Sequence, residues 1–221
     1  MNTMNVKYEN KNHMTDFIPQ IEPWIDDSEL KELMRVIEST YVVEHDLTKE
    51  FEGMICDLTG SKYAVAMTNG TVAIFCCLKA LGIMRVEDIE ACVSDSTKAI
   101  MPVHLYGQCA DMKSIMDFAN ERNIKVVEDA AQGVGVLLDG QHVGTFGQLG
   151  VLSFYGNKTL TCGEGGVIIT DDKDLRDCCY RLKNHGRDGK GTFKHDHIGY
   201  NFCFTEMQAA VGISQMKEYS N

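Results

Sequence analysis

The chain has 221 residues, of which 44% are hydrophobic and 24% charged, and its net charge is −11. These values are ordinary for a soluble globular protein and suit one large domain, or one domain and a fragment. The acidic balance argues against nucleic acid as the main partner, because binding a phosphate backbone requires a basic face. A small anionic ligand is still possible, since it needs only a local group of N–H donors.

The nine cysteines do not indicate a metal site or a disulfide framework. Their number is odd and no two are spaced as C-x-x-C, so we expect reduced, mostly buried thiols in a cytoplasmic protein, and no metal. Residues 1–17 are polar and lack the apolar stretch of a signal peptide, and no segment approaches the roughly 18 apolar residues of a membrane span. We expect a flexible lead over 1–17 and one domain over 18–221.

Helical and strand patterns alternate along the chain. Strands are predicted by short apolar runs, and helices by apolar residues at spacings of three and four. The final helix is expected to begin at Thr205, which can form a capping box with Gln208. The alternation predicts an α/β domain with a mostly parallel sheet and flanking helices. In chain order the expected elements are helices 27–38, 48–59 and 70–81, with strand 63–67 before the last of these, then strand 98–103, helix 112–120, strands 124–129, 149–154 and 166–170, and helices 173–182 and 205–219.

The turn Asn69-Gly70-Thr71 lies between a predicted strand and a helix start. Free N–H groups and the helix dipole favour a phosphate there, Gly70 allows close approach, and the Thr71 hydroxyl adds a donor. The turn is also compatible with a simple strand–helix connection capped by a side chain.

Two further motifs could carry chemistry. Asp129 comes just past the end of an apolar strand, the edge where open α/β sheets bind ligands, although taken alone it is more typical of a helix N-cap. Lys158 follows the strand that delivers Ser153 and precedes a glycine-rich loop. A lysine in an ordered, partly desolvated loop can form a Schiff base, although most lysines are only solvated charges. His104, which follows another strand, is expected to be structural.

Taken together, these motifs stand in the order needed to hold pyridoxal 5′-phosphate (PLP). The turn would anchor the phosphate, Asp129 would meet the pyridinium nitrogen, and Lys158 would meet the aldehyde. From about Phe17 to the end the sequence resembles the DegT/DnrJ/EryC1/StrS family of PLP-dependent sugar aminotransferases, most of all members of the perosamine synthase type. The matching stretches are KYAVA at 62–66, NGT at 69–71, ALGI at 80–83, TKAIMPVHLYG at 97–107, VEDAAQ at 127–132, SFYGNK at 153–158, GEGG at 163–166, NHG at 184–186, GYN at 199–201 and MQAAVGISQ at 207–215.

The resemblance implies a fold, an activity and roles for site residues. The fold would be the large domain of the type I PLP-dependent transferases. The activity would be transfer of an amino group from glutamate to C4 of a nucleotide-linked 4-keto-6-deoxy sugar, in the biosynthesis of amino sugars for surface polysaccharide or glycan. Lys158 would hold the cofactor and Asp129 would pair with its ring nitrogen, while the remaining contacts come from Gly70, Thr71 and Ser153 at the phosphate, Gln132 at the ring hydroxyl, and Asn201 at the phosphate of a neighbouring subunit in a homodimer.

The sequence also departs from the family pattern in three places. After Leu81-Gly82-Ile83 the chain passes directly to residues 84–89, so one sheet unit of about 30 residues, with the aromatic residue that stacks on the cofactor, is expected to be missing. The C-terminal small domain is expected to be absent, and Cys203 stands where relatives usually carry Arg.

These departures leave three hypotheses. The chain could be an active aminotransferase, a non-catalytic or truncated relative that binds PLP or dimerises, or a different lysine-dependent PLP enzyme such as a lyase. The motifs at 153–158 and 163–166 argue against the last of these.

Overall fold

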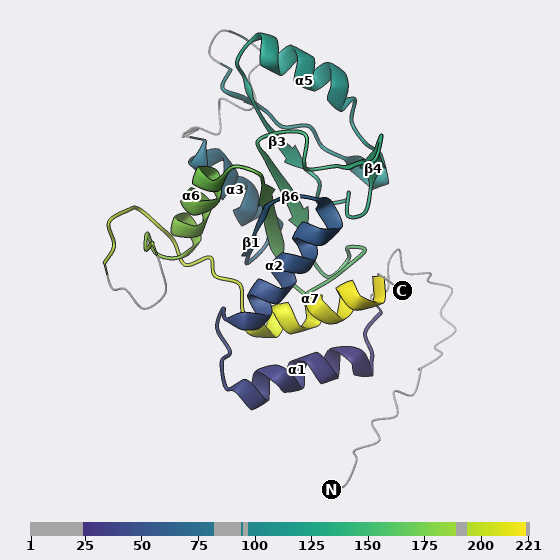
Figure 1. Ribbon diagram of the computed structural model, residues 1–221, viewed down its shortest axis with the longest axis vertical. Helices are drawn as coiled ribbons and strands as arrows, with labels where there is room; N and C mark the ends of the chain where they lie inside the picture. The colour runs from purple at the N-terminus through teal and green to yellow at the C-terminus, as the bar shows by residue number, and fades with distance from the viewer. Residues whose placement is uncertain (1–23, 82–93, 95–96, 189–193, 220–221) are drawn as a thin grey trace, which may run out of the picture.

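The computed structural model describes residues 24–81, 94, 97–188 and 194–219 (Figure 1). The lead predicted over 1–17 and the junction predicted at 84–89 lie outside these ranges. None of the described helices is long and apolar enough to cross a membrane. The helices are α1 (Asp27–Ser39), α2 (Asp46–Thr59), α3 (Gly70–Ala80), α5 (Met112–Glu121), α6 (Lys173–Lys183) and α7 (Glu206–Tyr219), with a 3-10 turn at Leu105–Gly107; the strands are β1 (Tyr63–Met67), β2 (Ala99–Ile100), β3 (Lys125–Asp129), β4 (Leu137–Leu138), β5 (Gln141–His142), β6 (Leu149–Ser153) and β7 (Gly166–Thr170).

A five-stranded sheet in the order β1-β7-β6-β3-β2 forms the centre of the described structure. β2, β3 and β6 pair in parallel, whereas β7 pairs antiparallel with both β6 and β1. Four of the five strands therefore run in one direction. The predicted α/β class with a mostly parallel sheet is confirmed.

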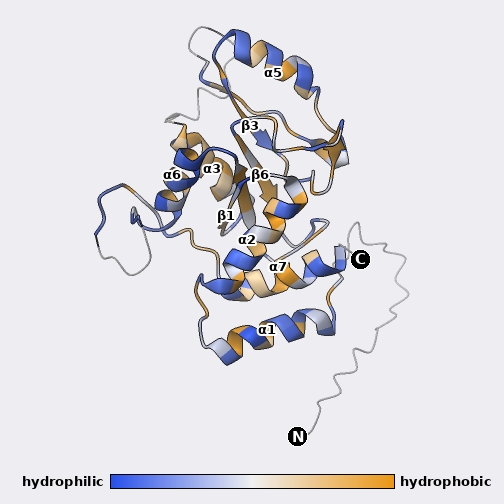
Figure 2. Cartoon of the chain, viewed as in Figure 1, coloured by the Kyte–Doolittle hydropathy of each residue, from blue (hydrophilic) through white to orange (hydrophobic). Residues whose placement is uncertain are grey.

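Helices cover both faces of the sheet because its strands are apolar on both sides (Figure 2). On one face, Val127, Val151 and Ile168 pack with residues of α3 and α6. On the other, Leu152 and Val167 pack with residues of α2 and α7. α5 covers a smaller cluster beside β3. Side chains alternate along each strand, so neighbouring residues of β3 and β6 face different layers.

Side-chain caps fix most helix starts. Asp26 forms a capping box with Glu29 at α1, and Asp172 accepts two N–H groups at the start of α6. At α7, the Thr205 N–H donates to Gln208 Oε1 at 3.1 Å and the Gln208 N–H donates to Thr205 Oγ1 at 3.3 Å. This is the predicted capping box.

α2 is capped by a residue distant in sequence. Its N-cap position, His45, makes no side-chain cap bond. Instead the buried carboxylate of Glu206, at the start of α7, accepts the N–H groups of His45, Leu47 (2.7 Å) and Thr48 (3.0 Å) and the Thr48 hydroxyl. The negative charge lies at the positive end of the helix dipole. α7 also lies beside α1 (Figure 1), so it ties both N-terminal helices to the sheet.

Buried side chains close the outer edge of β1. The Ala66 N–H donates to Glu52 Oε1 at 2.8 Å, and the Ala66 carbonyl accepts from Lys183 Nζ at 2.9 Å. Lys183 is fully buried and also lies 2.9 Å from Glu44 Oε2 and 3.6 Å from Glu52 Oε1. These groups take the place of a further strand, which protects the edge.

Two local features differ from the sequence prediction. The strand expected over 98–103 is regular only at Ala99–Ile100, with a single further bridge between Val103 and Asp129. Pro102 lies between the two parts and has no N–H to donate, which interrupts the ladder. The short hairpin β4–β5 was not predicted. Its turn is Asp139-Gly140, both with positive φ, a typical two-residue hairpin connection.

Candidate active site

The N-terminus of α3 presents unused N–H donors. Asn69 Oδ1 caps the helix by accepting the Val72 N–H at 2.9 Å, and the Asn69 carbonyl accepts the Ala73 N–H. Within the described residues, the N–H groups of Gly70 and Thr71 have no protein acceptor. Helix starts leave such donors orphaned, and together with the dipole they favour an anion.

Glycine at position 166 allows this turn to lie against the sheet. A Cβ on Gly166 of β7 would lie 2.4 Å from the carbonyl carbon of Asn69 and 2.6 Å from the Gly70 nitrogen. Any side chain there would push the turn away. Gly166, the last glycine of the GEGG motif, is therefore needed for the position of the turn that we predicted to bind phosphate.

A hollow of about 560 Å³ opens in front of this turn, at the ends of β3 and β6. Five of the seven predicted site residues line it: Gly70, Thr71, Asp129, Ser153 and Lys158. The whole lining consists of Asn69, Gly70, Thr71, Val72, Ile74, Asp129, Ala131, Val151, Ser153, Tyr155, Lys158 and Glu164. Residues up to 95 positions apart in sequence thus share one concave surface.

Ser153 extends the group of donors at the turn. Its Cβ lies 3.4 Å from the position that a Cβ on Gly70 would occupy, so the two residues are neighbours. The Ser153 oxygen accepts the Tyr155 N–H at 3.4 Å. Because that bond uses an oxygen lone pair, the Ser153 hydroxyl hydrogen is left to donate to a ligand.

Asp129 ends β3 with its backbone fixed on both sides. Its N–H donates to the Pro102 carbonyl at 2.9 Å, and its carbonyl accepts the His104 N–H at 3.0 Å. Oδ1 accepts the Ala131 N–H at 3.0 Å. No bond to Oδ2 is made by the described residues, so one carboxylate oxygen is left for a ligand in the hollow.

Lys158 lies in the loop after β6, where its N–H donates to the Tyr155 carbonyl at 2.9 Å. The side chain is half-buried and lines the hollow. Among the described residues no carboxylate oxygen lies within 4.0 Å of its amine. An amine that is partly desolvated and not engaged in an ion pair can react with an aldehyde.

Gln132 and Asn201 are not among the residues that line the hollow, although Gln132 follows directly on Ala131, which does line it. Gln132 Oε1 accepts the Tyr106 N–H at 2.8 Å. Asn201 is exposed and forms an isolated bridge with Asn184, beyond α6. The contact predicted between Gln132 and the ring hydroxyl of the cofactor stays a prediction. The contact predicted between Asn201 and the phosphate in a neighbouring subunit also stays a prediction, because the structure contains one chain.

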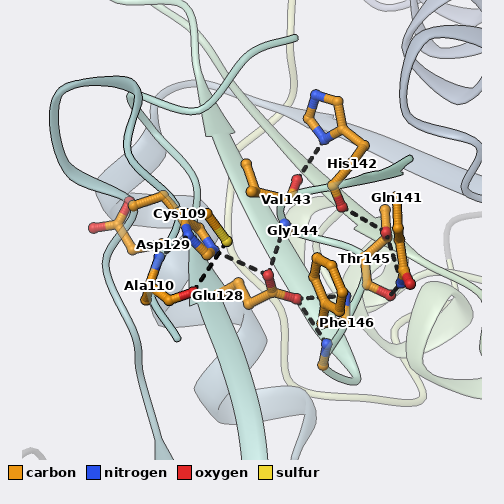
Figure 3. A network of polar contacts seen from close by, with 12 residues as sticks. Cys109, Ala110, Glu128, Asp129, Gln141, His142, Val143, Gly144, Thr145 and Phe146 are labelled. Carbon is orange, nitrogen blue, oxygen red and sulfur yellow. Dashed lines mark hydrogen bonds and ion pairs between the residues drawn. The ribbon is translucent and has the colours of Figure 1, made fainter. Parts of the chain in front are cut away.

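A buried polar network beside the hollow was not predicted. Glu128 is fully buried, and its carboxylate accepts the N–H groups of Gly144, Phe146 and Gly147, each at 2.7 Å (Figure 3). His104 Nε2, also fully buried, lies 2.9 Å from the same carboxylate. The sequence offered one signal, because strand alternation places Glu128 and Asp129 on opposite faces of β3.

The sequence predicts no role for Tyr155 or Glu164, although both line the hollow. The arrangement as a whole fits PLP. N–H and hydroxyl donors lie near a helix start, a carboxylate has one unused oxygen, and an unpaired amine completes the set. These are the groups required by a phosphate, a pyridinium nitrogen and an aldehyde.

Comparison with known proteins bears on this arrangement. The sequence profile of the DegT/DnrJ/EryC1/StrS aminotransferase family matches residues 23–87 and 82–221. This chain belongs to that family. The predicted resemblance is confirmed, and the family match falls into two parts that meet at residues 82–87.

Individual relatives agree with the family assignment. The chain is 34% identical to GDP-perosamine synthase from Escherichia coli O157:H7, over 91% of this chain and 66% of that protein. The alignment covers 241 positions, whereas 91% of 221 residues is about 201, so about 40 positions lie opposite gaps in this chain. The chain thus spans slightly less than two thirds of that relative's length.

Solved structures confirm the type I transferase fold. The aminotransferase from Psychrobacter cryohalolentis superposes with a TM-score of 0.81 at 30% identity, over 90% of this chain and 64% of that one. NtdA from Bacillus subtilis, solved with its bound cofactor PMP, superposes with a TM-score of 0.78 at 26% identity, over 93% of this chain and 58% of that one.

Proposed function

We propose that this chain binds PLP in the hollow and transfers an amino group from glutamate to a nucleotide-linked 4-keto-6-deoxy sugar. The observation that carries the proposal is that five predicted residues from three separate motifs line one cavity. Similarity to GDP-perosamine synthase favours a GDP-linked sugar and a role in making amino sugars for surface polysaccharide. We place the protein in the cytoplasm, where nucleotide sugars are made.

Each residue would contribute one physical function. The N–H groups of Gly70 and Thr71 and the Ser153 hydroxyl would bind the phosphate, aided by the α3 dipole. Asp129 would keep a proton on the ring nitrogen through its unused oxygen. Bound PLP supplies an electron sink for the substrate carbon that loses its proton. The Lys158 amine would hold the cofactor in place and, when released from it, carry that proton.

We also propose a homodimer with a shared site. Asn201 is exposed and lies outside the hollow of its own chain, which suits a contact with the phosphate bound by a second copy. α1 presents Leu30 and Ile37, each more than half exposed, and Met34 at 46% exposure. Grouped exposed apolar side chains of this kind mark association surfaces.

A second candidate is a relative that binds PLP without turnover. The two-part family match and the gaps of about 40 positions support a chain that lacks an internal element. The resemblance implies that this element carries the aromatic side chain that stacks on the cofactor, so its loss would remove one support that catalysis needs.

Chemical trapping separates these candidates. The chain is incubated with PLP, reduced with borohydride and digested, and mass spectrometry locates the adduct. We expect it on Lys158, and none in Lys158→Arg, which keeps the charge but cannot form the linkage; Lys173→Arg, an exposed lysine on α6, is the matched control. The chain is then supplied with a GDP-linked 4-keto-6-deoxy sugar and glutamate. An adduct with turnover supports the enzyme, an adduct without turnover supports the second candidate, and no adduct on Lys158 rejects both.

A further inference from the structure

The backbone determines which end of the Gln132 amide is available to a ligand. The Tyr106 N–H donates to Gln132 Oε1 at 2.8 Å. An N–H group can bond only to the oxygen of a carboxamide, so the oxygen must face Tyr106. The amide nitrogen has no acceptor among the described residues. Gln132 is therefore available to a ligand as a donor.

The donor on Tyr106 is held in an unfavourable conformation. Tyr106 has a φ of 51° and a ψ of 39°, the left-handed region that side chains other than glycine rarely adopt. Its own side chain is 78% exposed and does not pack into the core. Other contacts of the segment must therefore stabilise this backbone.

His104 supplies those contacts. Its Nδ1 accepts the Ala110 N–H at 3.2 Å, so Nδ1 carries no hydrogen. Nε2 therefore carries the hydrogen and donates it to Glu128 Oε2 at 2.9 Å. The imidazole is thus a neutral link that closes residues 104–110 into a loop and fastens that loop to β3.

Glu128 is itself fixed by the N–H groups of Gly144, Phe146 and Gly147 (Figure 3). With His104, these give the buried carboxylate four donors, enough to stabilise its charge. Because β3 alternates, Glu128 faces away from the hollow while Asp129 lines it. The loop anchored by Glu128 bonds through the backbones of Pro102 and His104 to the backbone of Asp129.

We propose that His104 and Glu128 are a positioning pair that holds the 102–110 segment and thereby turns Gln132 to donate, through its amide nitrogen, to the ring hydroxyl of the cofactor. The inference rests on the proposed function, which supplies the cofactor. Neither His104 nor Glu128 touches the hollow, so both would act through Tyr106 and Gln132.

The donor can be detected by titrating the visible absorbance band of the PLP-loaded chain with pH. The midpoint of that titration is the pH at which half of the lysine–cofactor linkage is protonated. Protonation of the lysine–cofactor linkage is favoured by the negative ring oxygen beside it, and a donor to that oxygen weakens the attraction. The ionised side chain of Gln132→Glu can still accept from Tyr106 but cannot donate, and it adds a negative charge. Both changes favour the protonated linkage, so the midpoint should rise by at least about one pH unit, the size of one hydrogen bond to a charged group.

Variants of His104 test the positioning step. His104→Leu should raise the midpoint in the same direction as Gln132→Glu. His104→Gln keeps a donor for Glu128 and should restore the midpoint in part. His142→Leu removes another buried histidine that makes no bond to the 102–110 segment, and should leave the midpoint unchanged even if it lowers the melting temperature. A midpoint that moves in Gln132→Glu but not in His104→Leu would overturn the proposal.

Amide hydrogen exchange in the cofactor-free chain gives an independent test. The Tyr106 and Ala110 N–H groups should be protected in the wild type, lose protection at least tenfold in His104→Leu, and keep it in His142→Leu. Unchanged protection of Tyr106 in a folded His104 variant would refute the positioning pair whether or not PLP binds. If borohydride traps no adduct on Lys158 of the wild type, but the Tyr106 N–H loses protection in His104→Leu, the proposed function is rejected and the positioning pair is not.

Discussion

Removing the carboxylate of Glu206 should strongly destabilise the chain. Glu206→Ala leaves three N–H groups at the start of α2 and the Thr48 hydroxyl without their acceptor. A hydrogen bond to a charged group contributes about 1.5–3 kcal/mol, and loss of a helix cap with its favourable charge costs about 1–2 kcal/mol. Water can reach part of the exposed helix end, so we expect a net loss of about 3–5 kcal/mol out of a typical 5–15 kcal/mol.

Urea unfolding followed by circular dichroism measures this loss. The midpoint should fall while the slope stays the same, because the surface exposed on unfolding is unchanged. Glu206→Gln keeps one acceptor and should lie between the wild type and Glu206→Ala. Glu121→Ala, an exposed carboxylate at the end of α5, is the control and should change stability by less than about 0.5 kcal/mol. A loss below about 1 kcal/mol for Glu206→Ala would refute the capping argument.

Three further predictions concern the sheet and its edges. Gly166→Ala should displace the Asn69–Gly70 turn and weaken PLP binding at least tenfold in a fluorescence titration. Gly53→Ala, which has open space at its Cβ, should leave PLP binding unchanged, and equal affinities of the two variants would contradict the role of Gly166. Lys183→Met leaves Glu44, Glu52 and the Ala66 carbonyl without their ammonium partner. It should lower the free energy of unfolding measured in urea by about 3–5 kcal/mol. Lys49→Met, at an exposed lysine, is the control and should leave that free energy almost unchanged. Burial lowers the pKa of His142 below its usual 6.5, and its Nε2 must stay unprotonated to accept the Gly135 N–H. The unfolded chain takes up this proton near pH 6.5, whereas the folded chain takes it up only at lower pH. The contribution of His142 to stability is therefore present above about pH 6.5 and is lost as the pH falls through the lower pKa of the folded state. Below pH 6.5 the urea midpoint of His142→Gln should depend less on pH than that of the wild type, and an identical pH dependence in the two proteins would disprove the assignment.

Much of the fold follows from local sequence. Tyr63–Met67 and Gly166–Thr170 form strands with the predicted bounds, because short apolar runs between turn residues are a strong local signal. The β4–β5 hairpin also had a local signal in Asp139-Gly140, but two-residue strands are too short for a periodicity to reveal. The shortening of β2 at Pro102 could equally have been anticipated from the missing N–H.

The site was only partly predictable. Asp129 ends β3, and Gly70 and Lys158 lie in the segments that follow β1 and β6, where the chemistry of a single turn can be recognised in sequence. Three of the four partners of Glu128 are the backbone N–H groups of Gly144, Phe146 and Gly147, and the identity of those residues carries no information about the bonds. The same holds for Glu206, whose partners precede it by about 160 residues. Such contacts depend on how separate segments pack.

The position of α7 has a consequence for biosynthesis. A ribosome releases residues 46–59 long before residue 206, so the start of α2 lacks the Glu206 carboxylate while the residues between them are made. The apolar surface that Ala209, Ala210, Ile213 and Met216 cover stays in contact with water until α7 emerges. Completion of this core therefore cannot precede the release of residues 206–219. A nascent chain stalled before α7 should remain protease-sensitive and dependent on chaperones, even though every strand of the sheet has already been made.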